Sequence, residues 1–306
     1  MTMEKLMNSG QNTQRNWTMN KFGIQNEADL SQNEADLSRR RWLQGSAGAL
    51  LAAGFWPGRL RAEDNGSASF NFLAINDTHF SSPKCPGWFE KVTASVRGLK
   101  EKPAFCLVVG DLAQDGKQEE LGPIKEILKG FGVPFHAVPG NHDYTRAGER
   151  AIYDELFPNQ LNYHFEHQGW QFVGLDSSEK TKFNGVTIQP PTFAWLEGNL
   201  PRLDKKKPTV LFTHFPLAAG VRMRPLNADA LLERFLDFNL VAVFNGHFHG
   251  FTENKIGETV ITTNKCCAIS RGNHDGTREK GYFECTVRDG ALTRKFVEVL
   301  PGKERV

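Results

Sequence analysis

Aspartate, histidine and asparagine residues directly follow five apolar runs of this sequence, in four cases on short turns that carry glycine or proline. Oxygen and imidazole ligands of this kind suit Zn, Mn, Fe or Co, and they argue against copper(I) or thiolate sites. Open α/β sheets place their ligands beyond the ends of their strands. The pattern therefore predicts a metal centre at one edge of a sheet. The five segments are Asn76–His79, Gly110–Asp111, Pro139–Asp143, Thr213–Pro216 and Asn245–His249.

The spacing within these segments supports shared ligation. In an extended segment, residues separated by one position point to the same side, because side chains alternate with a period of two. A catalytic zinc usually takes only three protein ligands and a water, so the candidate ligands are too many for one ion. We therefore expect two metal ions with Asp111 as the bridging carboxylate. The predicted ligands are Asp77, His79, Asp111, Asn141, His214, His247 and His249.

These turns require strands that end side by side. From residue 69 onward, apolar β-branched runs alternate with helical patterns, which is typical of α/β layering. Strands are expected at 70–75, 105–109, 135–138, 163–167, 171–175, 210–213, 241–245, 259–263, 282–287 and 292–299. Helices are expected at 88–100, 118–131, 146–156, 193–203 and 229–238. We predict an α/β fold in which two mixed β-sheets pack as a sandwich flanked by helices.

The ordered motifs DTH, GDL, GNHD, THFP and GHFH, which begin at residues 77, 110, 140, 213 and 246, resemble those of the calcineurin-like metallophosphoesterases. The resemblance spans roughly residues 75–250. It implies one metal held by Asp77, His79, Asp111 and His249, and a second held by Asp111, Asn141, His214 and His247. It also implies that His142 is the acid near the leaving group, with Asp143 as a candidate either to orient it or to cap the helix expected near Arg146.

Two departures from the motifs of other phosphatases limit the subclass of phosphoesterase that the sequence resembles. Purple acid phosphatases carry a tyrosine three residues after the bridging aspartate, where this chain has Gln114. Serine/threonine phosphatases have an aspartate at that position to pair with the catalytic histidine, but the nearby carboxylate here is Asp115. The spacing is more similar to that of small bacterial phosphodiesterases that act on cyclic nucleotides or glycerophosphodiesters.

The resemblance implies hydrolysis of a phosphoester. Two cations about 3.5 to 4 Å apart would activate a shared water as hydroxide and hold the phosphate oxygens. Imidazole, with an ordinary pKa near 6.5, suits the proton that the leaving oxygen needs, which favours His142 as general acid. A small phosphodiester is the expected substrate, and Mn, Fe or Zn the expected metals. A phosphomonoesterase is the alternative enzyme, and a non-catalytic metal-binding interaction module is the alternative of another class.

Three further residues are candidates for substrate contact. Arg222 and Arg224 follow His214 and could clamp a phosphate, although solvation at the surface explains them equally well. His274 lies in a second Gly-Asn-His-Asp segment, residues 272–275, which no apolar strand precedes. We interpret that segment as a loop from which Asn273 or His274 could reach the substrate.

Composition excludes several classes of protein. The chain has 306 residues, of which 39% are hydrophobic and 24% charged, as in ordinary globular proteins. Its net charge is +2, but residues 1–62 hold 8 basic and 5 acidic residues, which leaves 29 basic and 30 acidic in the remainder. No nucleic-acid partner is therefore expected. No apolar run reaches the roughly 18 residues typical of a membrane span, and the oligomeric state stays open.

The first 62 residues predict export. Residues 1–38 are polar and are expected to be a disordered leader, in which Gln25–Ser31 is copied without change as Gln32–Ser38. Residues 39–62 combine arginines, a short apolar stretch and a small residue, as signal peptides do, and SRRRWLQ resembles a twin-arginine signal. We expect an exported enzyme that uses the export machinery, or alternatively a protein tethered by an uncleaved signal. Residues 63–306 are expected to form one domain.

Overall fold

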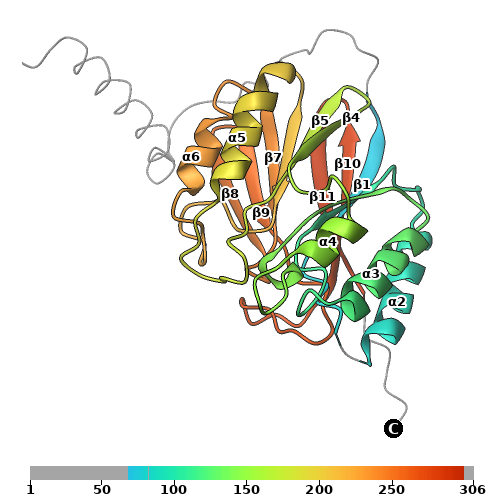
Figure 1. Cartoon of the computed structure of the whole chain (residues 1–306). Helices are drawn as coiled ribbons and strands as arrows, with labels where there is room; N and C mark the ends of the chain where they lie inside the picture. Colours follow the sequence, from blue (N-terminus) through green and yellow to red (C-terminus); the bar gives the residue numbers. More distant parts are fainter. Residues whose placement is uncertain (1–67, 82, 300–306) are drawn as a thin grey trace, which may run out of the picture. The chain divides into compact units, whose positions relative to one another are not determined.

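The computed structural model of the chain describes residues 68–81 and 83–299. The predicted leader and export signal, residues 1–62, lie outside the described residues. All described residues belong to one compact unit of the chain. Two β-sheets form the centre of this unit, with helices on both sides (Figure 1). The predicted sandwich of two mixed sheets flanked by helices is confirmed.

The first sheet has five strands in the order β11-β10-β1-β2-β3. The three strands β1, β2 and β3 run parallel, whereas β10 pairs antiparallel with both β1 and β11. The strands are β1 (Phe70–Ile75), β2 (Cys106–Val109), β3 (Phe135–Val138), β10 (Gly281–Arg288) and β11 (Ala291–Glu298). The last two strands of the described chain thus return to the sheet that its first strand begins.

The second sheet has six strands in the order β4-β5-β6-β7-β9-β8. Strands β5, β6, β7 and β9 run parallel, and the edge strands β4 and β8 are antiparallel to their neighbours. The strands are β4 (Tyr163–His167), β5 (Trp170–Leu175), β6 (Thr209–Thr213), β7 (Leu240–Asn245), β8 (Thr252–Ile256) and β9 (Thr259–Thr263).

Alternating side chains of β1 separate two cores. Phe70, Phe72 and Ala74 pack between the sheets against aromatic residues of the second sheet such as Phe172 and Phe244. Such alternation is the pattern that a strand buried on both faces requires. The sheets are thus held face to face by a largely aromatic layer.

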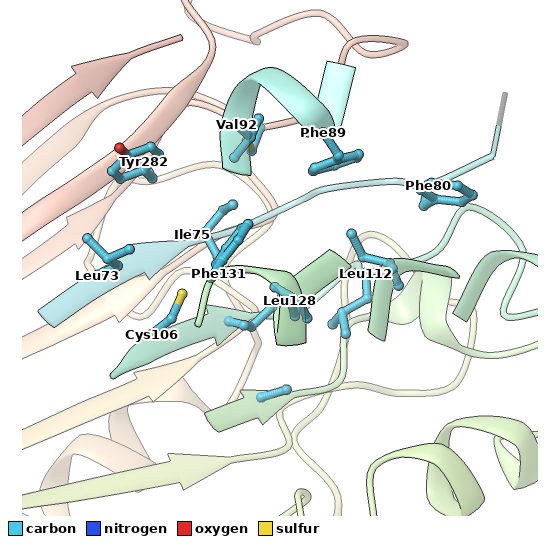
Figure 2. Packing of buried hydrophobic residues seen from close by; sticks show 14 of the residues in the cluster. Leu73, Ile75, Phe80, Phe89, Val92, Cys106, Leu112, Leu128, Phe131 and Tyr282 are labelled. Atoms are coloured by element: carbon cyan, nitrogen blue, oxygen red, sulfur yellow. The ribbon is translucent and has the colours of Figure 1, made fainter. Parts of the chain in front are cut away.

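The other face of the first sheet is covered by helices. Leu73 and Ile75 of β1 pack with Phe89 and Val92 of α2, and Leu128 of α3 joins them (Figure 2). The helices among the described residues are α2 (Cys85–Arg97), α3 (Gln118–Gly130), η2 (Asn141–Asp143), α4 (Ala151–Leu156), α5 (Pro190–Asn199), η3 (Leu200–Arg202) and α6 (Ala228–Glu233). α5 and α6 cover the second sheet through a separate apolar cluster.

The structure corrects several predicted elements. Strand β8 was not predicted, because its sequence TENKI is mostly polar, as suits an edge strand with an exposed face. The helix expected at 146–156 begins only at residue 151, and the one expected at 229–238 ends at residue 233. Across the described part of the chain, none of the helices has the length and apolar character needed to cross a membrane.

Candidate metal centre

The predicted ligands meet where parallel strands of both sheets end. Asp77 and His79 follow β1, Asp111 follows β2, and Asn141 lies in η2 directly after β3. From the second sheet, His214 follows β6. His247 and His249 follow β7. The two sheets therefore contribute to one site, because their carboxyl-terminal edges face the same end of the sandwich.

One group of four possible ligands contains Asp77, His79, Asp111 and His249. Its ligand atoms all lie within 4.8 Å of one another. His249 Nε2 lies 3.0 Å from Asp77 Oδ1 and 3.1 Å from His79 Nε2. His79 Nε2 is in turn 3.5 Å from Asp111 Oδ2. The four side chains are buried, so a cation here would be held mainly by protein atoms.

A second group contains Asp111, His214 and His247, again with ligand atoms within 4.8 Å. His214 Nε2 lies 3.3 Å from Asp111 Oδ2 and 3.2 Å from His247 Nδ1. Two outer carbonyls fix these rings: His214 Nδ1 lies 3.1 Å from the oxygen of Val109, and His247 Nε2 lies 2.7 Å from that of Phe183. Such partners orient metal-binding imidazoles. Asp111 belongs to both groups and can bridge two ions.

The backbone at these ligands is unusual. Asp77, His79, Asp111, His247 and His249 all have positive φ, between 38° and 62°. Residues with side chains rarely adopt this left-handed conformation, and such strain concentrates at functional sites. The neighbouring glycine at position 140 is also required, since a Cβ there would collide with the Asp111 carboxylate. The fold therefore tolerates a strained backbone at these residues, and this conformation brings the ligands together.

Two buried carboxylates raise the pKa values of the imidazoles next to them. Burial alone would lower the pKa of His249, but Asp77 raises it to about 11. Burial likewise opposes charge on His214, while Asp111 raises its pKa to about 9. Burial lowers the pKa of His247 to about 4, which leaves the neutral imidazole that binds metals. Bound cations would displace the protons that now balance the carboxylates.

The residues present fit a pair of metal ions. Asn141 has a buried side-chain oxygen, Oδ1, without a hydrogen-bond partner among the described residues. A buried acceptor of this kind is costly unless something binds it. Together with the carboxylate and imidazole atoms, it offers the oxygen and nitrogen donors that Zn, Mn or Fe accept. Asn141 therefore completes the second group as a candidate ligand.

His142 lies at the same edge, with its ring 4.7 Å from that of His79. Its Nδ1 is 2.7 Å from the backbone oxygen of Gln114, and because a carbonyl only accepts, Nδ1 carries a proton. Asp143 does not orient this imidazole, contrary to the prediction. Its carboxylate instead accepts the backbone N–H groups of Ala113 and Gly140, at 2.9 and 2.8 Å. Asp143 thus fastens together the turns that carry the ligands, and Gln114 takes the orienting position.

A pocket of about 540 Å³ opens above the two groups of ligands. Arg222 and His274, both predicted to contact substrate, line it. Arg224 does not line it, because its guanidinium pairs with Asp229 at 2.5 Å and donates to the Leu217 carbonyl. Arg271, which was not predicted from the sequence, also lines the pocket. No motif or strand end marks this loop residue.

Comparison with known proteins identifies the family. Residues 70–251 match the calcineurin-like phosphoesterase family, which is more than half of the chain. The chain belongs to the calcineurin-like phosphoesterase family, and its activity is that of a phosphoric ester hydrolase with a metal-ion centre.

Individual relatives agree with this assignment. The chain is 29% identical over 214 residues to a glycerophosphodiester phosphodiesterase, GpdQ, of Enterobacter lignolyticus, covering 62% of this chain and 74% of that protein. It is 28% identical over 224 residues to a probable cyclic nucleotide phosphodiesterase of Psychrobacter arcticus, covering 64% and 80%. A purple acid phosphatase of yellow lupin has a similar fold, with a TM-score of 0.58 and 12% identity over 78% of this chain and 53% of that one.

Proposed function

We propose that this protein is a dinuclear metal-dependent phosphodiesterase that acts on a small phosphodiester. The observation that carries the proposal is the sharing of Asp111 by two groups of buried ligands, with His142 beside them in one pocket. The relatives that are named glycerophosphodiester and cyclic nucleotide phosphodiesterases support a diester. A pocket of about 540 Å³ has room for a phosphate with a substituent on each side.

The candidate ligands define where the reaction takes place. Asp77, His79, Asp111 and His249 would hold one ion, and Asp111, His214 and His247 the other, with the unpaired Oδ1 of Asn141 as a further ligand of the second. Bound there, the ions would supply Lewis-acid activation of water and neutralise charge on the phosphoryl oxygens. Manganese, iron and zinc all suit these donors, and we propose that the natural pair is drawn from them.

We propose that His142 donates a proton to the leaving group. Its protonated Nδ1 donates to the Gln114 carbonyl, which aims the opposite nitrogen, Nε2, away from that carbonyl. When the ring is fully protonated, Nε2 can pass its proton to the ester oxygen as the bond between phosphorus and that oxygen breaks. The imidazole then remains neutral, with its Nδ1 hydrogen bond unchanged.

Two substrates separate the proposed activity from its alternative. We expect the Mn-loaded protein to hydrolyse bis-p-nitrophenyl phosphate with a higher kcat/KM than p-nitrophenyl phosphate. A monoester rate equal to or above the diester rate would make the protein a phosphomonoesterase. No hydrolysis of either ester by a folded, metal-loaded sample would favour the non-catalytic binding module.

We also propose that the protein is exported, with the segment SRRRWLQ at residues 38–44 as a signal read by the twin-arginine machinery. Replacing Arg39, Arg40 and Arg41 together by lysine should abolish export of the full chain, as measured by cell fractionation. Accumulation of the mature form outside the cytoplasm in that variant would contradict the proposal. A full-length product that remains in the membrane fraction would instead indicate the uncleaved tether.

A further inference from the structure

Two arginines near the pocket, Arg146 and Arg224, have carboxylate partners, whereas Arg271, like Arg222, has none among the described residues. Arg146 pairs with Asp115, and Arg224 pairs with Asp229. In contrast, within the described residues no carboxylate pairs with Arg271, although its side chain is half-buried. A guanidinium that is partly withdrawn from water and has no counter-charge is a binding group for an anion.

A neutral side chain holds Arg271 in place. Its Nε and Nη2 atoms donate to Gln114 Oε1 at 3.0 and 2.7 Å. Because an amide oxygen carries no net charge, these bonds fix the direction of the guanidinium without neutralising it. Among the described residues, none accepts a hydrogen bond from Nη1, so this end of the fork remains available.

The guanidinium lies beside the candidate acid. Arg271 Nη2 is 3.4 Å from His142 Nε2, the nitrogen that faces away from the Gln114 carbonyl. Because a guanidinium only donates, Nε2 accepts in this contact, and it can carry the proton for the leaving group only when Nη2 turns to the substrate instead. Arg271 also lines the pocket together with His79 and Asp111 of the candidate metal centre. A phosphate seated at the metal centre and next to His142 would therefore come within reach of this arginine.

Hydrogen bonds of Asn273 hold the loop that carries Arg271 in place. Asn273 Oδ1 accepts from the ammonium of buried Lys280 at 2.9 Å, and its Nδ2 donates to the Glu279 carbonyl at 2.9 Å. Cys266 contacts the same ammonium, with Sγ 2.9 Å from Nζ. Asn273 thus braces the loop rather than reaching the pocket. Pre-organisation of this kind lowers the cost of binding.

We propose that Arg271 binds a non-bridging phosphoryl oxygen of the substrate, and that Gln114 is the residue that positions it. This inference rests on the proposed phosphoesterase function and adds an anion-binding group to the pocket at the candidate metal centre. Gln114 occupies the position where the related phosphatases have tyrosine or aspartate. In this chain, the residue at that position accepts the hydrogen bonds that orient Arg271. The expected ligand class is a phosphate monoanion or a phosphodiester.

The test compares Arg271→Ala with Arg278→Ala, which removes an exposed arginine of the same loop that does not line the pocket. Both variants are loaded with Mn and checked for unchanged thermal unfolding. We expect Arg271→Ala to weaken binding of inorganic phosphate, measured by calorimetry, by roughly 10- to 100-fold. The kcat/KM for bis-p-nitrophenyl phosphate should fall by a similar factor. Arg278→Ala should match the wild type.

Gln114→Ala tests the positioning role. It keeps the backbone carbonyl that His142 uses, so its effect should come through Arg271. We expect a smaller loss of phosphate affinity, roughly 3- to 10-fold, that disappears in the Arg271→Ala background. An equal loss in both backgrounds would show that Gln114 acts independently of the arginine.

Equal phosphate affinity in Arg271→Ala and Arg278→Ala would overturn the inference about Arg271. If the proposed function is wrong, the wild type will hydrolyse neither ester. Calorimetry with inorganic phosphate will still show in that case whether Arg271 binds the anion.

Discussion

Asp111 is the residue on which both groups of ligands depend. It is 1% exposed, contacts His79 and His214 through Oδ2, and accepts the backbone N–H of His142 through Oδ1 at 2.8 Å. One carboxylate therefore links the two metal positions and the segment that carries the candidate acid. A conservative change at this residue should disturb all three at once.

We predict that Asp111→Asn removes metal-dependent hydrolysis without unfolding the protein. Asparagine keeps the shape but loses the charge that a bridging ligand supplies, so kcat/KM should fall by more than about 100-fold. Asp115→Asn is the control, since Asp115 pairs with Lys117 and Arg146 at the rim. Full activity of a folded Asp111→Asn variant would end the catalytic account.

His142→Asn should distinguish proton donation from phosphate binding. A general acid typically contributes about 10²- to 10⁴-fold to the rate, but only where the leaving oxygen needs a proton. We therefore expect a large loss of kcat on an alkyl phosphodiester and a much smaller one on bis-p-nitrophenyl phosphate, because p-nitrophenolate leaves unprotonated. Equal losses on both esters would indicate that His142 only holds the phosphate.

At the scale of elements, the pocket wall depends on a link between α4 and β5. Arg150, at the start of α4, ion-pairs with Asp176, which directly follows β5. It also donates to the hydroxyl of Tyr144, a pocket residue, at 2.7 Å. Burial nevertheless raises the pKa of Asp176 above its ordinary value of 3.8 despite the nearby arginine. Burial of this ion pair therefore costs free energy, and removal of one partner would also cost free energy because it would leave a buried charge unpaired.

Arg150→Ala should lower the free energy of unfolding by about 3 kcal/mol at pH 7, because it strands a buried carboxylate. The sign of the pH dependence follows from the raised pKa. The folded variant holds the Asp176 proton more tightly than the unfolded chain, so the loss should appear as pH rises above about 4 and shrink below it. Urea titrations at pH 4 and 7 measure this difference.

The exposed partner of Arg150 provides the control. Asp154 is 48% exposed in its ion pair with Arg150, so Asp154→Ala should cost less than about 1 kcal/mol at both pH values. A penalty for Arg150→Ala that does not change with pH would show that packing, and not the stranded charge, explains the loss.

The sequence predicts strand ends far better than loops. The ligands could be predicted because each lies just beyond an apolar run, so the topology of parallel strands places them at one edge. The expected alternation along extended segments is not what positions them, since Asp77, His79, His247 and His249 have positive φ. Arg271 and Gln114 could not be predicted, since their contact joins residues 157 positions apart in loops without periodicity. Strand β8 was missed for a related reason, because an exposed edge strand needs few apolar residues.

At the scale of the whole molecule, the aromatic layer between the sheets keeps the two halves of the site in register. Phe172 of β5 is fully buried and lies against Phe70 and Phe72 of β1 and against Phe105, which directly precedes β2. Since each sheet supplies ligands, movement of one sheet against the other would separate them. The core therefore serves the site as well as stability.

Phe172→Ala should lower the free energy of unfolding by about 3 to 5 kcal/mol, as expected for removal of a buried phenylalanine. Phe251→Ala removes an aromatic ring that is 46% exposed and should cost much less. Calorimetric unfolding of both variants checks the prediction. Similar small losses would show that the layer between the sheets is loosely packed.

Anomalous diffraction from a Mn-saturated crystal would show directly whether Asp111 bridges two metal ions. We expect two peaks about 3.5 to 4 Å apart in each chain, with Asp111 between them and imidazoles on both sides. A single peak at saturation, or two peaks of which only one contacts Asp111, would contradict it.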